Sequence, residues 1–290
     1  MYKRIFFYLA ASIFLQSFAQ TPVQKIDLVK GQKIMVTDSM TMKVSQEAMG
    51  QTVELNASSK TLTQLEVKDV ADNKKVITST LQKVRSSFDA MGQSSSYDSE
   101  KPGDNNSEAA KAYETKLNKP EEITIDNLGK SLKAEKVVVK KPAADNSGNP
   151  MDALMNMSGN SSNTTVENAF MILPAGIKPG ATWTDSAVAE GIKTIHIFIL
   201  KSILQNEGVV TLMGVITGNK KMEMQGMDLT AVIGGKVDGE ILIDISTGRV
   251  KKTSSVTEMN NSVEVMGQTV PVTGKIISVS TYTPIITPGK

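Results

Sequence analysis

The chain has 290 residues, of which 40% are hydrophobic, and this length and apolar content can supply the core of a globular protein. Its 32 basic and 30 acidic residues are interspersed and leave a formal net charge of +2, which excludes the basic stripe that nucleic acid requires. The absence of cysteine excludes disulfides, thiolate metal sites, cysteine nucleophiles and a lipid anchor on cysteine.

The first residues have the pattern of a secretory signal peptide. Lys3 and Arg4 precede an apolar run over residues 5–15, and Ala19 is a small residue suited to a cleavage site. A transmembrane anchor is the alternative, but the run is shorter than the ~20 residues that span a bilayer. We therefore expect residues 1–19 to be removed and the mature chain to be exported, periplasmic or extracellular, soluble and not lipid-anchored.

Residues 20–92 are predicted to form an N-terminal β half. Apolar side chains occupy the even positions over residues 34–44, with Asp38 as the one acidic exception, and the odd positions over residues 53–57 and 65–67. This period of two is typical of strands that are buried on one face. Residues 76–89 follow a polar turn and complete a strand, tip, strand, turn and strand order.

Residues 93–168 form a polar, low-complexity insertion. It contains one expected short helix at residues 107–117 and an expected hairpin that turns at residues 127–129. A few apolar residues within it could form a lid over the sheet: Met151, Leu154 and Met155. The alternative is that this part of the insertion is a disordered loop.

Residues 169–290 are predicted to form a C-terminal β half that repeats the same order of strands and turns over a longer segment. The expected strands are residues 192–204, 209–217, 227–245, 250–265 and 269–282. Gly234, Gly235 and Gly239 mark where the long strand should bulge or bend. The fold class is therefore mainly β: a long curved antiparallel meander, half-barrel or sandwich-like, with two related halves in one domain and a small helical insertion.

The segment MGQTV occurs twice, at Met49–Val53 and at Met266–Val270, with variants at residues 91–93 and 222–227. Glycine suits the two-residue turns of hairpins, so these segments are predicted hairpin tips. Alternate turns of a meander fall at one end of the sheet, and a turn does not need flanking methionines. We therefore predict either plain turn chemistry or an apolar ligand rim made by Met49, Met91, Met224, Met227 and Met266.

The sequence contains few groups suited to catalysis. His196 is the single histidine and shares a strand face with apolar residues, which is typical of a packed side chain. Glu121 and Glu122 are adjacent, so on a strand they would face opposite sides and could not form an acid–base pair. The chain lacks the common nucleophile and phosphate-loop motifs. We expect no enzymatic activity and no cofactor.

Sixteen methionines raise the question of copper, because thioethers are soft ligands that prefer Cu(I). Met222, Met224 and Met227 have a spacing that could bring three sulfur atoms together across a turn. Methionine also fills irregular cores and binding surfaces, and neither histidine nor cysteine lies beside these residues. Copper binding is therefore the weaker of the two interpretations.

Several segments together resemble a family of exported bacterial proteins that carry a domain of unknown function. They are KGQKIMVTDSMTMKV, MGQTVELNASSKTLTQLEVKDV, YDSE, LPAGIKPGATWTDS and GEILIDISTGRVKKTSSVTEM. The resemblance covers most of the chain after residue 19, but these motifs describe strands and turns and imply no activity. More distantly, the expected shape is similar to the periplasmic lipoprotein carrier LolA and to mycobacterial lipid-binding lipoproteins.

These observations lead to two hypotheses about function. The first is an exported, non-enzymatic binding protein whose curved sheet holds an apolar ligand such as a lipid or an acylated molecule. The alternative is a structural or interaction module of the cell envelope that has a filled core and no ligand. The expected partner is an apolar small molecule or an envelope protein, without nucleic acid and without a transmembrane segment in the mature chain.

Overall fold

The computed structural model describes residues 22–48, 51–90, 92–106, 108–132, 162–189, 191–224, 227–265 and 268–285. The expected signal peptide and the candidate lid residues Met151, Leu154 and Met155 lie outside these ranges, so both stay predictions. Within the ranges, no helix is long and apolar enough to cross a membrane.

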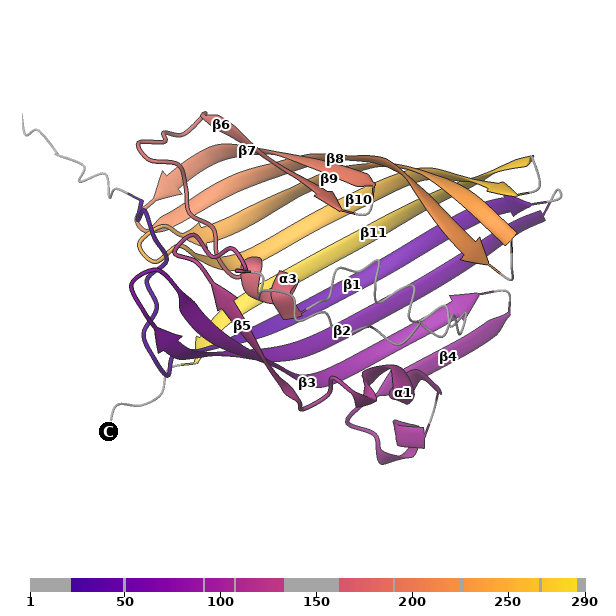
Figure 1. Ribbon diagram of the computed structural model, residues 1–290, viewed down its shortest axis with the longest axis horizontal. Helices are drawn as coiled ribbons and strands as arrows, with labels where there is room; N and C mark the ends of the chain where they lie inside the picture. Colours follow the sequence, from indigo (N-terminus) through magenta and orange to yellow (C-terminus); the bar gives the residue numbers. More distant parts are fainter. Residues whose placement is uncertain are drawn as a thin grey trace, which may run out of the picture.

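Eleven strands form one large antiparallel sheet, which confirms the mainly β prediction (Figure 1). The strands are β1 Lys33–Ala48, β2 Gln51–Val70, β3 Lys75–Ala90, β4 Gln93–Asp98, β5 Pro120–Ile125, β6 Thr182–Ala189, β7 Ile192–Leu204, β8 Glu207–Met224, β9 Met227–Asp244, β10 Arg249–Val265 and β11 Gln268–Ile285. Their order across the sheet is β4-β3-β2-β1-β11-β10-β9-β8-β7-β6, and β5 pairs with β3 outside this path. The sheet is not closed, because β4 and β6 are its two edges.

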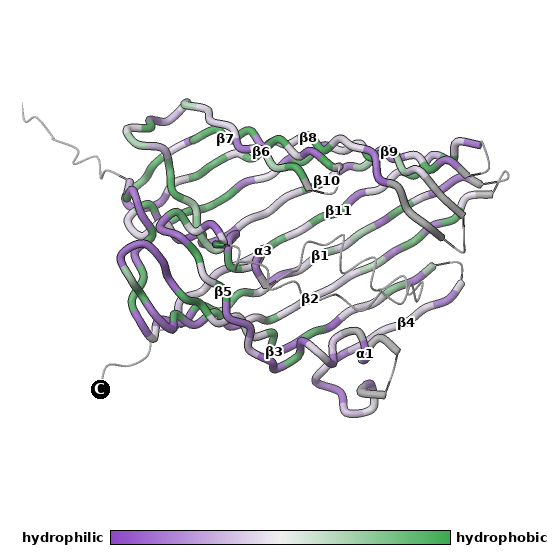
Figure 2. Tube along the Cα trace, viewed as in Figure 1, coloured by the Kyte–Doolittle hydropathy of each residue, from purple (hydrophilic) through white to green (hydrophobic). Residues whose placement is uncertain are grey.

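The strands follow the period of two that the sequence predicts. On β1, Ile34, Val36, Met40 and Met42 are buried on one face, whereas the residues between them are more exposed. We call the face that carries these four residues the inner face and the opposite one the outer face. Figure 2 shows the resulting alternation of hydrophobic and hydrophilic residues along the strands.

The N-terminal and C-terminal halves of the chain share this one sheet. The first strand, β1, pairs with the last strand, β11, over fourteen register positions that begin at Lys33–Ile285 and end at Gln46–Val272. On its other side, β1 pairs with β2. The central strands of the sheet therefore come from the first and last parts of the chain. The edge strands β4 and β6 come from the middle of the chain.

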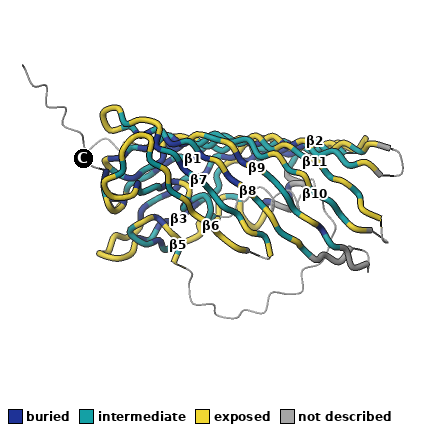
Figure 3. Tube along the Cα trace, turned by 90° about the horizontal axis from the view of Figure 1, so that it is seen from above, coloured by how far each residue is buried: buried dark blue, intermediate teal, exposed yellow. Residues whose placement is uncertain are grey.

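The sheet is curved. In the view of Figure 3, β1 and β2 run along the top of the picture, and β5 and β6 lie lower down. Glycines permit close approach of neighbouring strands. A Cβ atom on Gly239 would lie 2.5 Å from the carbonyl oxygen of Ser254, and one on Gly218 would lie 2.5 Å from that of Gly191. The register of β9 and β10 also shifts between Val250 and Ser262, which agrees with the irregularity expected near the glycines of β9.

The inner face is covered by two apolar clusters. The first lies at the end of the sheet where β1 begins, and β5, the N-terminal segment and the chain around helix α3 (Ser162–Glu167) pack on it. Its covering residues include Ile26, Leu28, Ile123, Ile125, Val166, Phe170 and Leu173. The second lies under helix α1 (Glu108–Glu114), which follows the 3-10 helix η1 (Pro102–Asn106). There the rings of Tyr97 and Tyr113 stack with centroids 5.5 Å apart.

Several local elements differ from the sequence-based expectations, whereas the short helix does not. Helix α1 is seven residues long and lies inside the expected range of residues 107–117. Strands β4 and β6 and helix α3 were not expected, and β4 occupies the start of the predicted insertion. Strand β6 lacks an alternating pattern because it is an edge strand, and residues 184–188 on it are all exposed. The expected turn at residues 127–129 is present, and Gly129 adopts a φ of 85° there.

Candidate functional site

The strand ends next to the methionine-containing turns lie at one end of the sheet. Ala48 pairs with Gln51, Met224 with Met227 and Val265 with Gln268, and the register of the intervening strands places these pairs together. Met49, Met91 and Met266 lie outside the described residues, as do the side chains of Met222, Met224 and Met227. The ligand rim and the copper site therefore both stay predictions.

Between this end and the packed clusters, the inner face carries apolar side chains that are only partly buried. Val44, Leu55, Phe88 and Ile276 pack against the second cluster and are only partly buried. Ile216 of β8 is similarly exposed beside the first cluster. The inner face thus offers an apolar surface that continues past the residues that fill the core.

A polar pocket interrupts this apolar surface at Asp38. The register places Asp38 directly between Thr61 of β2 and Ser280 of β11, and both hydroxyl groups donate hydrogen bonds to its carboxylate. The pocket has a volume of about 70 Å³. Its lining consists of Asp38, Met40, Ser59, Thr61, Thr63, Ser79, Leu81, Tyr113, Thr115, Lys116, Lys119, Glu121, Ser162 and Thr165.

Helix α1 and the turn after it form one wall of this pocket. The amide nitrogen of Leu117 donates to the carbonyl oxygen of Tyr113 at 2.8 Å, and that of Asn118 donates to the carbonyl oxygen of Leu81 at 2.7 Å. Asn118 adopts a φ of 57°, so the chain reverses there. The turn is thereby tied to β3, with Lys116 and Lys119 exposed at the mouth of the pocket.

Burial alters the acid–base chemistry of the pocket floor. Loss of water around Asp38 raises the pKa of its carboxyl group, even though the hydrogen bonds from Ser280 and Thr61 act in the opposite direction. The neighbouring phenol of Tyr282 also has a raised pKa, because it is buried and lies near the charge of Asp38. Asp38 has no ion-pair partner among the residues that the structure describes.

His196 lies on the inner face of β7, in register with Asp185 of β6. Its ring is tilted against that of Phe198, with centroids 6.0 Å apart. Burial lowers the pKa of the imidazole, and Asp185 opposes this effect. Asp185 itself forms an ion pair with Lys130 at 3.3 Å. This environment is that of a packed histidine, as the sequence indicated.

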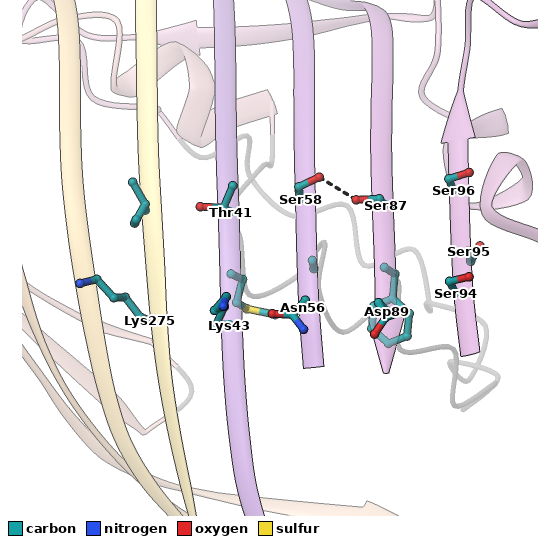
Figure 4. Close-up of a pocket in the computed structure, with 14 residues that line it drawn as sticks. Thr41, Lys43, Asn56, Ser58, Ser87, Asp89, Ser94, Ser95, Ser96 and Lys275 are labelled. Carbon is teal, nitrogen blue, oxygen red and sulfur yellow. Dashed lines mark hydrogen bonds between the residues drawn. The ribbon is translucent and has the colours of Figure 1, made fainter. Parts of the chain in front are cut away.

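The outer face carries a second hollow of about 600 Å³ over β11, β1, β2, β3 and β4 (Figure 4). Two rows of polar side chains cross these strands in register. One row is Thr41, Ser58, Ser87 and Ser96, in which the hydroxyl groups of Ser58 and Ser87 are 2.7 Å apart. The other row is Lys275, Lys43, Asn56, Asp89 and Ser94.

Sequence reasoning did not identify either the Asp38 pocket or the outer hollow. Asp38 stood out as the acidic exception on an apolar strand face, but its neighbours come from distant segments of the chain. Glu121 lines the pocket and Glu122 does not, and both are exposed on β5. In the described ranges, no three histidine or acidic side chains are grouped to hold a metal ion.

Comparisons with known proteins point to one family and to one related fold. Residues 72–250 match the model described as "Family of unknown function (DUF6263)", and the search of curated proteins gives no match. A solved structure concerned with lipid–protein interactions in lipovitellin is similar at 13% identity and a TM-score of 0.51. The alignment covers 91% of this chain but only 26% of the lipovitellin chain, so it compares the fold of one part of that protein.

Outer membrane proteins also align, with weaker structural agreement. An outer membrane channel from Pseudomonas putida F1 shares 8% identity at a TM-score of 0.26, with 91% of this chain and 99% of that chain covered. OccK7 from Pseudomonas aeruginosa shares 7% identity at a TM-score of 0.27, with 89% and 100% covered.

Proposed function

Because the chain belongs to the DUF6263 family, whose function is unknown, we propose a function from its own geometry: it is an exported, non-enzymatic protein that holds an apolar ligand on the inner face of its sheet. The ligand class is a lipid or an acylated molecule. The observation that carries this proposal is the partly buried apolar surface of Val44, Leu55, Phe88 and Ile276, which extends beyond the packed core. Apolar surface that remains accessible favours association with an apolar partner.

The fold comparison supports the same proposal without identifying a ligand. Lipovitellin, to which the sheet is similar, is a protein studied for its lipid–protein interactions. A curved, open sheet gives a lipid chain one long apolar surface, and the backbone groups beneath it are already paired with neighbouring strands. Catalysis is not part of the proposal.

Native mass spectrometry of the protein purified without detergent tests this proposal. We expect co-purified lipid in the wild type and its loss from Ile276→Lys, which places a charge on the inner face. The matched control is Ile277→Lys on the outer face of the same strand, where the side chain is already 44% exposed. Lipid retention by both variants, or its absence from the wild type, would contradict the proposal.

The alternative, a structural or interaction module of the cell envelope, has one observation in its favour. The inner-face pocket around Asp38 is only about 70 Å³ in volume, which is too small for an acyl chain. A wild-type mass equal to that of the polypeptide alone would support this alternative. Copper binding has its own test, since replacing Met222, Met224 and Met227 by Leu keeps apolar volume but removes the three thioethers of the candidate copper site.

A further inference from the structure

The Asp38 pocket contains a half-buried carboxyl group that packing of the core does not explain. On the inner face of β1, the residues on either side of Asp38 are Val36 and Met40, with exposed fractions of 0% and 7%. An apolar residue between them would extend the core, whereas a carboxylate there costs desolvation free energy. The two hydroxyl donors leave part of its acceptor capacity unused, because a carboxylate has about four acceptor positions.

The charges around the pocket have a definite order. Asp38 lies on the floor, among the hydroxyl groups of Ser59, Thr61, Thr63 and Ser79. Lys116 and Lys119 lie at the mouth, and neither has an ion-pair partner among the described residues. Glu121 also reaches the mouth and offsets one of these two positive charges. A ligand that enters therefore meets positive charge first and negative charge at the bottom.

The size of the pocket restricts what can reach Asp38. A volume of about 70 Å³ accommodates one or two groups of the size of a water molecule. An ammonium group has this size and offers hydrogen-bond donors to the carboxylate and to the hydroxyl oxygens. The apolar side chains of Met40 and Leu81 also line the pocket, so it is continuous with the second apolar cluster.

We propose that this pocket binds the head group of an amphiphile that carries a primary ammonium next to a phosphate. The ammonium lies at Asp38, the phosphate lies at Lys116 and Lys119, and the acyl chains follow the apolar inner face. This inference rests on the proposed function, because it names the polar end of the same ligand. Burial raises the pKa of Asp38, so an incoming cation relieves part of the cost of ionising it.

Isothermal titration of the full chain with short-chain, monomeric phospholipids tests this assignment. Three lipids with identical acyl chains are compared: phosphatidylethanolamine, phosphatidylcholine and phosphatidylglycerol. Phosphatidylcholine keeps the positive charge but has no N–H donor, and phosphatidylglycerol has no ammonium. We expect phosphatidylethanolamine to bind at least about tenfold more tightly than either of the others, as a charge-assisted hydrogen bond requires.

Two sets of variants separate the two ends of the head group. Asp38→Asn should reduce the preference for phosphatidylethanolamine to about twofold or less, while binding of the other two lipids stays the same. The matched control is Asp238→Asn on the outer face of β9, where the carboxylate is exposed and the preference should persist. Lys116→Gln with Lys119→Gln should weaken all three lipids several-fold and keep the preference.

Each outcome decides between the two proposals. Equal affinity of the wild type for all three lipids would overturn the head-group assignment and leave the apolar-ligand proposal standing. The same holds if Asp38→Asn keeps the full preference while near-ultraviolet circular dichroism shows a native fold. If no phospholipid binds and none co-purifies, both proposals fail.

Discussion

The carboxyl group of Asp38 lies where burial disfavours its charged form, so the stability of the protein depends on pH. The pKa of Asp38 is raised in the folded protein, so the folded state binds more protons than the unfolded state between the ordinary pKa of aspartate and the raised value. The free energy of unfolding therefore falls as pH rises through this window. The stability that protonated Asp38 contributes is fully present below the ordinary pKa of aspartate and is lost above the raised pKa.

Asp38→Asn removes this titration while keeping the shape of the side chain. We expect the variant to gain stability relative to the wild type as pH rises from 3 to 7. Urea unfolding of both proteins at the two pH values measures the change. A difference between the two proteins that stays constant with pH would show that Asp38 does not titrate in this way.

Gly239 matters because the close approach of β10 leaves no room for a side chain at this position of β9. A Cβ atom there would lie 2.5 Å from the carbonyl oxygen of Ser254. We expect Gly239→Ala to lower the free energy of unfolding by about 2 kcal/mol, the usual cost of overpacking. Gly103→Ala is the control, because a Cβ atom at Gly103 meets nothing within 4 Å. Equal effects of the two substitutions would refute a steric role for Gly239.

At the scale of elements, β5 is the strand that pairs with β3 outside the main strand order and contributes Ile123 and Ile125 to the first apolar cluster. Ile125 at its end is fully buried, whereas Leu128 in the following turn is 52% exposed. We expect Ile125→Ala to cost about 3 kcal/mol of unfolding free energy, since it leaves a cavity in the core. Leu128→Ala should change it by less than about 0.5 kcal/mol. Chemical denaturation measures both, and similar losses would mean that β5 does not cover the core.

Elements that are buried on one face were predictable from sequence, and those without such a face were not. Strands β1, β2 and β9 alternate because their inner residues pack into a core. Strand β6 has the sequence TWTDSAVA, and its exposed residues carry no period. The Asp38 pocket was beyond prediction for another reason. Its wall depends on the register of β1 with β2 and on a contact between Leu81 and Asn118, which no local pattern encodes.

At the scale of the whole molecule, the pairing of β1 with β11 makes the two halves of the chain one structural unit. The register runs without interruption from Lys33–Ile285 to Gln46–Val272, and β1 is also paired along its length with β2. Neither half can lose its central strand without exposing the apolar inner face of the other. The halves should therefore unfold together rather than as separate domains.

Equilibrium unfolding followed by two probes tests this cooperativity. The fluorescence of Trp183, the single tryptophan, reports on β6 in the C-terminal half, while far-ultraviolet circular dichroism reports on all strands. We expect the two transitions to coincide within experimental error. A tryptophan transition that precedes or follows the loss of strand signal would indicate two domains that are stable separately.

The same pairing of the first and last strands also governs how the protein reaches its native state. Contacts between distant segments form only after a long loop has closed, and closing it costs chain entropy before any contact repays that cost. Hairpins such as β1–β2 and β10–β11 can form locally and early. The seam between them must wait until the last strand has been synthesised, so the unpaired edges of β1 and β11 are the parts of a nascent chain most in need of protection from aggregation.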